Sequence, residues 1–234
     1  MSAGPLDNRP ASGAPLVLLT GFEPFGGMDH NPSWDVVTAV AARAAAGQSS
    51  LPGAPEVRPL CLPVAFGQAP RLLDEAVEAA VVEGRPPAAV LALGLAAGTD
   101  VVRLERVGVN LRDARIPDNA GAQPADEPVV EGGDGALFST LRLKAAHTRI
   151  SAANIPVQLS LSAGSFVCND VLYSLLHGLR VRGLEIPGGF VHVPDLRDPL
   201  APVRLEGAVE AVEILLEEAL HGGADVATPG GTLH

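Results

Sequence analysis

The sequence predicts an α/β fold, a three-layer α/β/α sandwich with a largely parallel, mixed central sheet. Short apolar runs alternate with helical patterns along most of the 234 residues, the order that builds a parallel sheet covered by helices. The run at 88–93 is apolar throughout, as expected for a strand covered on both faces. Asn31 and Pro32 form a helix-start signal, an N-cap residue followed by proline at the first helical position.

The first half of the chain supplies three strands and two helices. The short apolar run at 16–20 predicts the first strand, and the helix that starts at Asn31 extends to about residue 46. A second strand at 57–64 precedes a helix at 70–82, where apolar residues recur at helical spacing. The third strand is the apolar run at 88–93.

The second half begins with a strand at 102–109, where apolar and polar residues alternate as in a strand with one exposed face. A polar stretch at 110–135, rich in Asp, Pro, Asn and Gly, follows. Loops of this length are usually functional or mobile, so we expect it to close over a site. The remaining elements are a helix at 137–152, a strand at 157–162, a helix at 169–180, a strand at 189–193 and a helix at 202–220.

Length and composition predict one intracellular domain. Residues 15–221 suffice for a single core, between a disordered, Pro-rich segment at 1–14 and a flexible tail at 222–234. There is no apolar run of membrane-spanning length and no secretory pattern at the start. With only two cysteines, we expect a reducing cytoplasmic location and neither a disulfide framework nor a Cys-rich metal site.

The formal net charge of −11 limits the partners. Nucleic acids select basic surfaces, and anionic lipid surfaces do the same. We therefore expect neither a nucleic-acid partner nor a membrane partner.

Cys168 is the first candidate for chemistry. It follows a predicted strand and a turn of small residues, at the start of a predicted helix. There the positive end of the helix dipole favours a thiolate, and free N–H groups can hold an oxyanion. The alternative is a buried core cysteine. Cys61 lies in mid-strand between leucines, and we expect it to be a structural residue.

Among the six histidines, His192 is the best candidate for a base, because it lies at the end of an apolar strand and such ends face the ligand crevice of open α/β sheets. Glu105 could orient the imidazole. The alternatives are a core histidine and a solvated strand charge. Phe22 and Phe25 follow the first strand in a chain with 3% aromatic residues; they could wall a small apolar slot or plug the core.

Several motifs occur together and in a fixed order. They are TGFEPFGG, NPSW, LGLAAG, ERVGVN, DARIPDNAGAQPADEP, FSTL, AGSFVCN and GFVHVP, from about residue 16 to residue 194. In these motifs the chain resembles the pyroglutamyl-peptidase I family, also called pyrrolidone-carboxylate peptidases. The resemblance implies a cysteine peptidase that removes N-terminal pyroglutamyl residues, with Cys168, His192 and Glu105 as its catalytic residues.

The resemblance also implies an acyl-enzyme mechanism without a metal or organic cofactor. Phe22 and Phe25 match the family's apolar walls around the pyroglutamyl ring, and Arg115 of DARIPDN would help to stabilise the oxyanion. The substrates would be pyroglutamyl peptides. Family members are often dimers or tetramers, so we expect a homo-oligomer.

The chain departs from the family pattern at five positions. The family often has Gln at Leu95, Arg at Thr99, Ser or Thr at Arg103, Ala at Gly108 and Asn in the segment around Leu161. Three alternatives stay open. The first two are a weakly active or non-catalytic homologue that binds pyroglutamyl peptides and a cysteine amidase for another cyclic or acylated amine. The third, by analogy of fold, is an α/β sandwich acting on nucleosides or phosphorylated sugars, which would need a cationic phosphate cradle that the sequence does not show.

Overall fold

The computed structural model describes residues 13–197 and 200–230. Its strands are β1 (Leu16–Phe22), β2 (Glu56–Leu62), β3 (Ala89–Leu95), β4 (Val102–Glu105), β5 (Val107–Val109), β6 (Ala136–Phe138), β7 (Val157–Ser160) and β8 (Gly188–Val193). Its helices are α1 (Pro32–Ala45), α2 (Gln68–Val82), α3 (Leu143–Ala152), α4 (Val167–Val181) and α5 (Leu205–His221).

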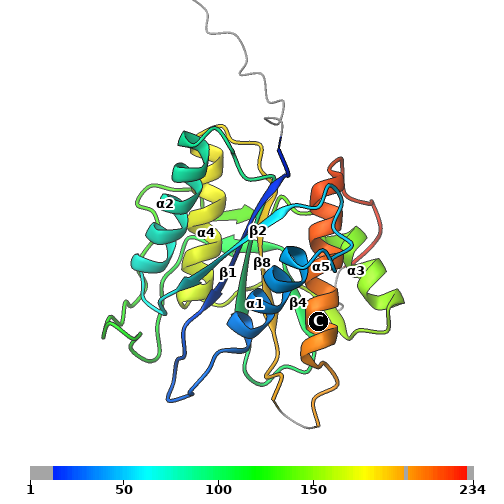
Figure 1. Ribbon diagram of the computed structural model, residues 1–234. Coiled ribbons are helices and arrows are strands. Elements are labelled where there is room, and N and C mark those ends of the chain that lie inside the picture. Colours follow the sequence, from blue (N-terminus) through cyan, green and yellow to red (C-terminus); the bar gives the residue numbers. More distant parts are fainter. Residues whose placement is uncertain (1–12, 198–199, 231–234) are drawn as a thin grey trace, which may run out of the picture.

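The main sheet has six strands in the order β2-β1-β3-β8-β4-β7. Neighbouring strands are parallel except for β4 and β8. Helices α2 and α4 cover one face, and α1, α3 and α5 lie on the other (Figure 1). This confirms the predicted α/β/α sandwich with a mixed, largely parallel sheet.

The start of α1 forms as its sequence predicts. Asn31 is the N-cap, and its Oδ1 accepts a hydrogen bond from the N–H of Ser33 at 3.1 Å. Pro32 occupies the first helical position, where its missing N–H costs nothing. Here a local signal and the structure agree to the residue.

The segment at 102–109 is not one strand. After Glu105 the chain leaves the main sheet, and β5 pairs antiparallel with β6 in a separate two-stranded sheet. Residue 137, where a helix was predicted to begin, therefore lies in a strand, and α3 begins at Leu143. That helix boundary was wrong because Leu137 is buried beside β5, and the N–H of Ser139 donates to the Arg106 carbonyl.

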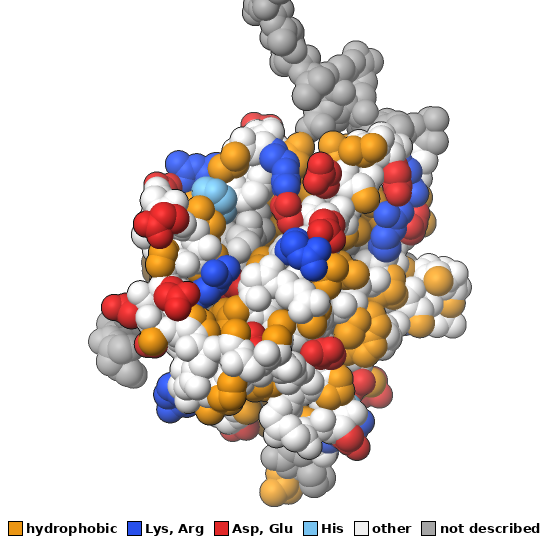
Figure 2. Space-filling view, turned by 90° about the vertical axis from the view of Figure 1, so that its left-hand side faces the viewer, with side chains coloured by type: hydrophobic (Ala, Val, Ile, Leu, Met, Phe, Trp, Pro, Cys, Tyr) orange, Lys and Arg blue, Asp and Glu red, His pale blue; other side chains and the backbone are white. Residues whose placement is uncertain are grey.

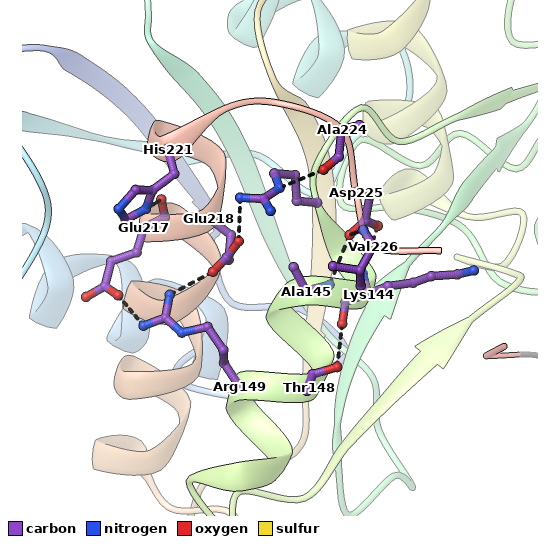
Figure 3. A network of polar contacts seen from close by, with 11 residues as sticks. Lys144, Ala145, Thr148, Arg149, Glu217, Glu218, His221, Ala224, Asp225 and Val226 are labelled. Carbon is purple, nitrogen blue, oxygen red and sulfur yellow. Dashed lines mark hydrogen bonds and ion pairs between the residues drawn. The ribbon is translucent and has the colours of Figure 1, made fainter. Parts of the chain in front are cut away.

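The C-terminal segment packs onto the start of α3 (Figure 3). The carboxylate of Asp225 accepts hydrogen bonds from the N–H groups of Lys144 at 2.9 Å and Ala145 at 3.0 Å. The Lys144 ammonium donates to the Thr228 carbonyl at 2.6 Å. Residues 222–230 thus make specific contacts with the domain, although their composition suggests a loose tail.

The other predicted boundary lies at the start of the chain. Residues 1–12 of the predicted 1–14 lead-in lie outside the described residues. The limits of the catalytic domain at 15 and 221 stay a prediction.

The surface over α2 and α4 carries basic and acidic side chains interspersed (Figure 2). Two ion pairs contribute to this pattern, Arg71 with Glu75 and Arg182 with Asp74, each at 2.5 Å. The net negative charge is therefore not gathered into one patch on this face. Within the described ranges, no helix has the length and apolar character needed to cross a membrane.

Candidate active site

His192 and Glu105 meet on two neighbouring strands. In the antiparallel pair of β8 and β4, Arg103 lies opposite His192 and Glu105 lies opposite Phe190. Residues two apart on a strand share a face, so His192 and Glu105 are diagonal neighbours on the face covered by α4. The Nδ1–H of His192 donates to Glu105 Oε1 at 2.8 Å, since a carboxylate only accepts. Both side chains are buried, Glu105 completely.

Cys168 lies near His192 and comes from helix α4, which covers this face of the sheet. It is the second residue of α4 and is half-buried. Its Sγ lies 2.9 Å from the point that a Cβ on Gly94 would occupy, and Gly94 is the β3 residue in register with His192. The thiol therefore sits against the β3–β8 pair at the level of the imidazole. Only a glycine at position 94 leaves it that room.

The charge of the imidazole depends on its two partners. Burial alone lowers the pKa of His192, but the negative charge and hydrogen bond of Cys168, followed by those of Glu105, outweigh it. Together they raise the pKa of His192 to about 9. At neutral pH the imidazole is thus protonated in the presence of a Cys168 thiolate, and a thiolate is the nucleophilic form of cysteine.

The N-terminus of α4 is open. Its N-cap residue, Phe166, makes no side-chain cap. The first N–H groups of a helix have no acceptor within it, and among the described residues those of 167–169 donate to no other group. They lie beside Cys168, where they can stabilise negative charge.

The long loop is anchored to the helix that carries Cys168. Asn169 Nδ2 donates to the carbonyls of Val109 and Leu111, each at 2.9 Å, and its Oδ1 accepts from the N–H of Val109. Asp170, also fully buried, pairs with Arg112 at 2.7 Å. The two residues that follow the candidate nucleophile thus fix the loop beside the site.

The pKa of Asp170 is raised. Burial is the main cause, and it outweighs the hydrogen bonds from the Gly67 N–H and from Arg112. The loop anchor is thus a desolvated carboxylate whose ion pair offsets only part of the cost of burial.

A second anchor ties the same loop to the turn that carries Phe25. Asn119 Nδ2 donates to Glu23 Oε1 at 2.7 Å and to the Pro24 carbonyl at 3.0 Å. Asp118 accepts from the N–H of Phe66 at 2.7 Å. The loop therefore bridges two aromatic segments.

Three phenylalanines gather at the N-cap position of α4, two residues before Cys168. The rings of Phe25 and Phe166 lie 5.4 Å apart, and Phe66 meets Phe166 edge-on at 5.1 Å. All three are partly exposed. Sequence reasoning missed Phe66 and Phe166, although an aromatic residue two positions before the candidate nucleophile of an aromatic-poor chain is a usable signal.

Phe22 fills the core, which is the second of the two roles that the sequence allows for it. It is 2% exposed and packs on Phe190 with the ring centres 6.4 Å apart. Phe190 in turn contacts the His192 ring at 4.9 Å. Phe22 thus belongs to the core beneath the site.

Arg115 is exposed on the long loop. Two positions earlier, the N–H of Asp113 donates to the Ser165 carbonyl, and the Ser165 hydroxyl donates to the Asp113 carbonyl. Ser165 comes three residues before Cys168. This link brings the Arg115 segment close to the turn that leads into α4.

Cys61 is not the buried core residue that its leucine neighbours suggest. It is exposed on β2, which is an edge strand with alternating burial. Its leucine neighbours do not bury the thiol, because an apolar run on an edge strand has one uncovered face. That Cys61 is a structural residue stays a prediction. Partial burial of the thiol and the charge of Glu23 raise the pKa of Cys61, so its thiolate is disfavoured at neutral pH. Among the described residues, no group of three or more His, Cys, Asp or Glu side chains could hold a metal ion.

Known proteins share this fold and much of this sequence. The family model of pyroglutamyl peptidases matches residues 16–220. The pyrrolidone-carboxylate peptidases of Escherichia fergusonii and Erwinia tasmaniensis are 42% and 43% identical to the chain over 224 residues, covering 93% of this chain and 99% of each relative.

Solved structures agree with the sequence relatives. The crystal structure of pyroglutamyl peptidase I from Bacillus amyloliquefaciens has a TM-score of 0.82 at 32% identity, and covers 93% of this chain and 100% of its own. A mutant pyrrolidone carboxyl peptidase from P. furiosus has a TM-score of 0.77 at 35% identity, covering 88% and 98%. This chain belongs to the pyroglutamyl peptidase family of cysteine peptidases.

Proposed function

We propose that this protein removes N-terminal pyroglutamyl residues from peptides through a Cys168–His192–Glu105 triad and an acyl-enzyme. The observation that carries the proposal is the placement of a thiol at an open helix N-terminus, level with an imidazole that is hydrogen-bonded to a buried carboxylate. This is the arrangement of nucleophile, base and orienting group that acyl transfer requires.

Acylation begins with the Cys168 thiolate. The sulfur attacks the carbonyl carbon of the pyroglutamyl–X bond, and the carbonyl π electrons move to oxygen. The open N–H groups of α4, assisted by Arg115, stabilise this oxyanion. As the oxyanion collapses, the C–N bond breaks, and the His192 imidazolium gives its proton to the leaving amine. A thioester and a free peptide amine result.

Deacylation uses water. The imidazole of His192, now neutral, takes a proton from the water molecule that attacks the thioester carbonyl. The second tetrahedral intermediate expels the Cys168 thiolate and releases pyroglutamic acid. Glu105 stabilises the imidazolium in both half-reactions, because its Oε1 accepts the Nδ1–H throughout.

The surroundings suit a neutral lactam. Pyroglutamate has no free α-amine, so its site needs apolar walls and backbone partners rather than a salt bridge. Phe25 and Phe166 offer such walls, since their rings are in contact and Phe166 lies two residues before Cys168. Phe22 packs in the core on Phe190, which contacts the His192 ring. The loop at 110–135 is anchored beside the site, and we expect it to close over the bound substrate.

The test is hydrolysis of a pyroglutamyl amide of a fluorescent arylamine. We expect activity in the parent protein, a drop of at least about 1,000-fold in Cys168→Ala, and a rate within about twofold of the parent in Cys61→Ala. Mass spectrometry of rapidly quenched samples should detect a pyroglutamyl adduct on the peptide that contains Cys168.

Three results would contradict the proposal. Equal activity in the parent and Cys168→Ala would remove the proposed nucleophile. Faster release from the prolyl or alanyl amide than from the pyroglutamyl amide would point to a different amidase. Tight binding of a pyroglutamyl peptide without any turnover would instead indicate a binding protein.

A further inference from the structure

Arg103 stands directly beside the proposed triad. It lies on β4 two residues before Glu105 and in register with His192 on β8, so its side chain emerges on the triad's face. The resemblance to the family implies Ser or Thr at position 103, so an arginine is a departure from the family pattern there. The geometry gives this cation a definite set of partners.

One end of the guanidinium lies against the triad carboxylate. Arg103 Nε is 3.4 Å from Glu105 Oε1, the same oxygen that accepts from His192 at 2.8 Å. The contact is an ion pair without hydrogen-bond geometry, since Nε has no hydrogen-bond partner among the described residues. The other carboxylate oxygen, Glu105 Oε2, is also buried and unpartnered within the described part of the chain.

The other end of the guanidinium donates hydrogen bonds to the segment at 160–162, which leads to Cys168. Arg103 Nη2 donates to Ser160 Oγ at 2.6 Å and to the Ser162 carbonyl at 3.2 Å. Ser160 ends β7 in register with Glu105, and Ser162 opens the turn that leads to Cys168. A planar, always-charged guanidinium is suited to hold two such sites in a fixed relation.

We infer that Arg103 is a positioning residue, which fixes Glu105 relative to the turn before Cys168 and sets the pH range in which the Cys168–His192 pair is reactive. The inference rests on the proposed Cys-His-Glu mechanism. Arg103 acts through Glu105 and the backbone of the turn.

The sign of its effect follows from charge. Among the described residues, the charged or titratable groups that contact His192 are Cys168 from α4 and Glu105 from β4. Arg103, also from β4, contacts Glu105, and β3 contributes the uncharged Gly94. A cation disfavours protonation of its neighbours. Removing Arg103 should therefore move both the acid and the basic limb of the activity profile to higher pH. A purely structural role would lower the rate and leave both limbs in place.

The first measurement does not depend on peptidase activity. Iodoacetamide reacts with a thiolate, whose sulfur bonds to the CH2 carbon as iodide leaves. In a Cys61→Ser background only Cys168 can react. We expect Arg103→Gln to move the midpoint of the alkylation–pH curve upward by roughly half a pH unit or more. The matched control is Arg58→Gln, which removes an arginine from β2 at the opposite edge of the sheet.

Two further variants separate charge from geometry. Arg103→Lys keeps the positive charge but loses the planar guanidinium that bonds at two ends. The midpoint of its alkylation–pH curve should therefore stay near that of the parent, while kcat falls and KM is unchanged. Arg103→Thr has the residue type usual in the family and favours a strand, so it serves as a second charge-removing variant if Arg103→Gln does not fold. Thermal unfolding checks the fold of each variant.

The outcomes are distinct. An unchanged midpoint in both folded charge-removing variants overturns the inference, whatever happens to kcat. An equal shift in Arg58→Gln also overturns it, because the effect would then be one of net charge. Failure of the mechanism itself shows separately, as absence of pyroglutamyl amide hydrolysis by the parent protein.

Discussion

Helices α3 and α4 both begin without a cap from their own N-cap side chains, but their first turns differ. At α3, the Asp225 carboxylate arrives from the C-terminal segment and accepts from the N–H groups of Lys144 and Ala145 (Figure 3). At α4, the N–H groups around Cys168 have no protein acceptor among the described residues. The first turn of α3 is thus capped by a carboxylate of the protein, whereas the first turn of α4 has no cap.

The difference separates stability from function. A capped first turn lowers the free energy of the folded state, because a buried or partly buried N–H without an acceptor is costly. An uncapped first turn leaves that favourable interaction for an anion formed during the reaction. The open N-terminus of α4 is therefore where we expect mutations to change rate, and the closed N-terminus of α3 is where we expect them to change stability.

Among variants that keep all three proposed triad residues, the largest effect should come from closing the space beside Cys168. In Gly94→Ala the new Cβ would lie 2.9 Å from Cys168 Sγ and 2.8 Å from Phe190 Cζ, so the thiol and the Phe190 ring, which contacts His192, must shift from their present positions. Because the thiol must be placed closely against the substrate carbonyl and His192 to react, kcat/KM should fall by about 100-fold. Hydrolysis of the fluorescent pyroglutamyl amide measures this fall in kcat/KM.

Gly207→Ala is the matched control for that variant. Gly207 lies in α5, and its nearest contact to a Cβ is an ordinary one at 4.0 Å to Ile155. This variant should keep full activity and gain about 0.5–1 kcal/mol of unfolding free energy. Wild-type activity in Gly94→Ala would mean that Cys168 does not react from the position seen beside β3.

A smaller effect concerns pH. Since Cys168 and Glu105 raise the pKa of His192 to about 9, the imidazolium persists through neutral pH, and kcat/KM should have its basic limb near pH 9. Glu105→Gln removes one of the causes of that rise, so the limb should move to lower pH, by roughly one unit. The direction is opposite to that expected on removal of the Arg103 charge.

The same raised pKa affects stability. An imidazolium favoured by folding contributes fully below the ordinary pKa of about 6.5, and this contribution is lost as the pH rises through about 9. Denaturant unfolding of the parent and of His192→Ala across pH 6–10 measures it. A difference between the two that does not shrink with rising pH would show that the imidazole is not held protonated.

Local patterns predicted much of the fold, because they depend on neighbours in sequence. The N-cap at Asn31 and the apolar strand β3 are examples. For Cys168 the helix start was also visible locally, although α4 begins two residues earlier than its pattern suggested. For His192 and Glu105 local patterns leave a core histidine and a solvated strand charge open as alternatives. Their pairing depends on the antiparallel placement of β4 beside β8, across 87 residues of chain.

The features that the sequence missed are long-range ones. Exposure of Cys61 depends on β2 being an edge strand, which a single strand's pattern does not reveal. The split after Glu105 depends on the partner strand β6. Likewise, nothing near α3 in the sequence indicates that a carboxylate 80 residues away will cap it.

That cap provides the smallest and most selective prediction. Asp225→Ala should leave two N–H groups of α3 without their acceptor and reduce the unfolding free energy by about 1 kcal/mol. Denaturant unfolding measures this loss. Asp225→Asn keeps only one of the two acceptor oxygens and should recover part of the loss. The value of kcat/KM should stay within about twofold of the parent in both variants. A large fall in kcat/KM without a loss of unfolding free energy would mean that the capped start of α3 is coupled to the uncapped start of α4. In that case the first helix turn could not be assigned to stability and the second to activity.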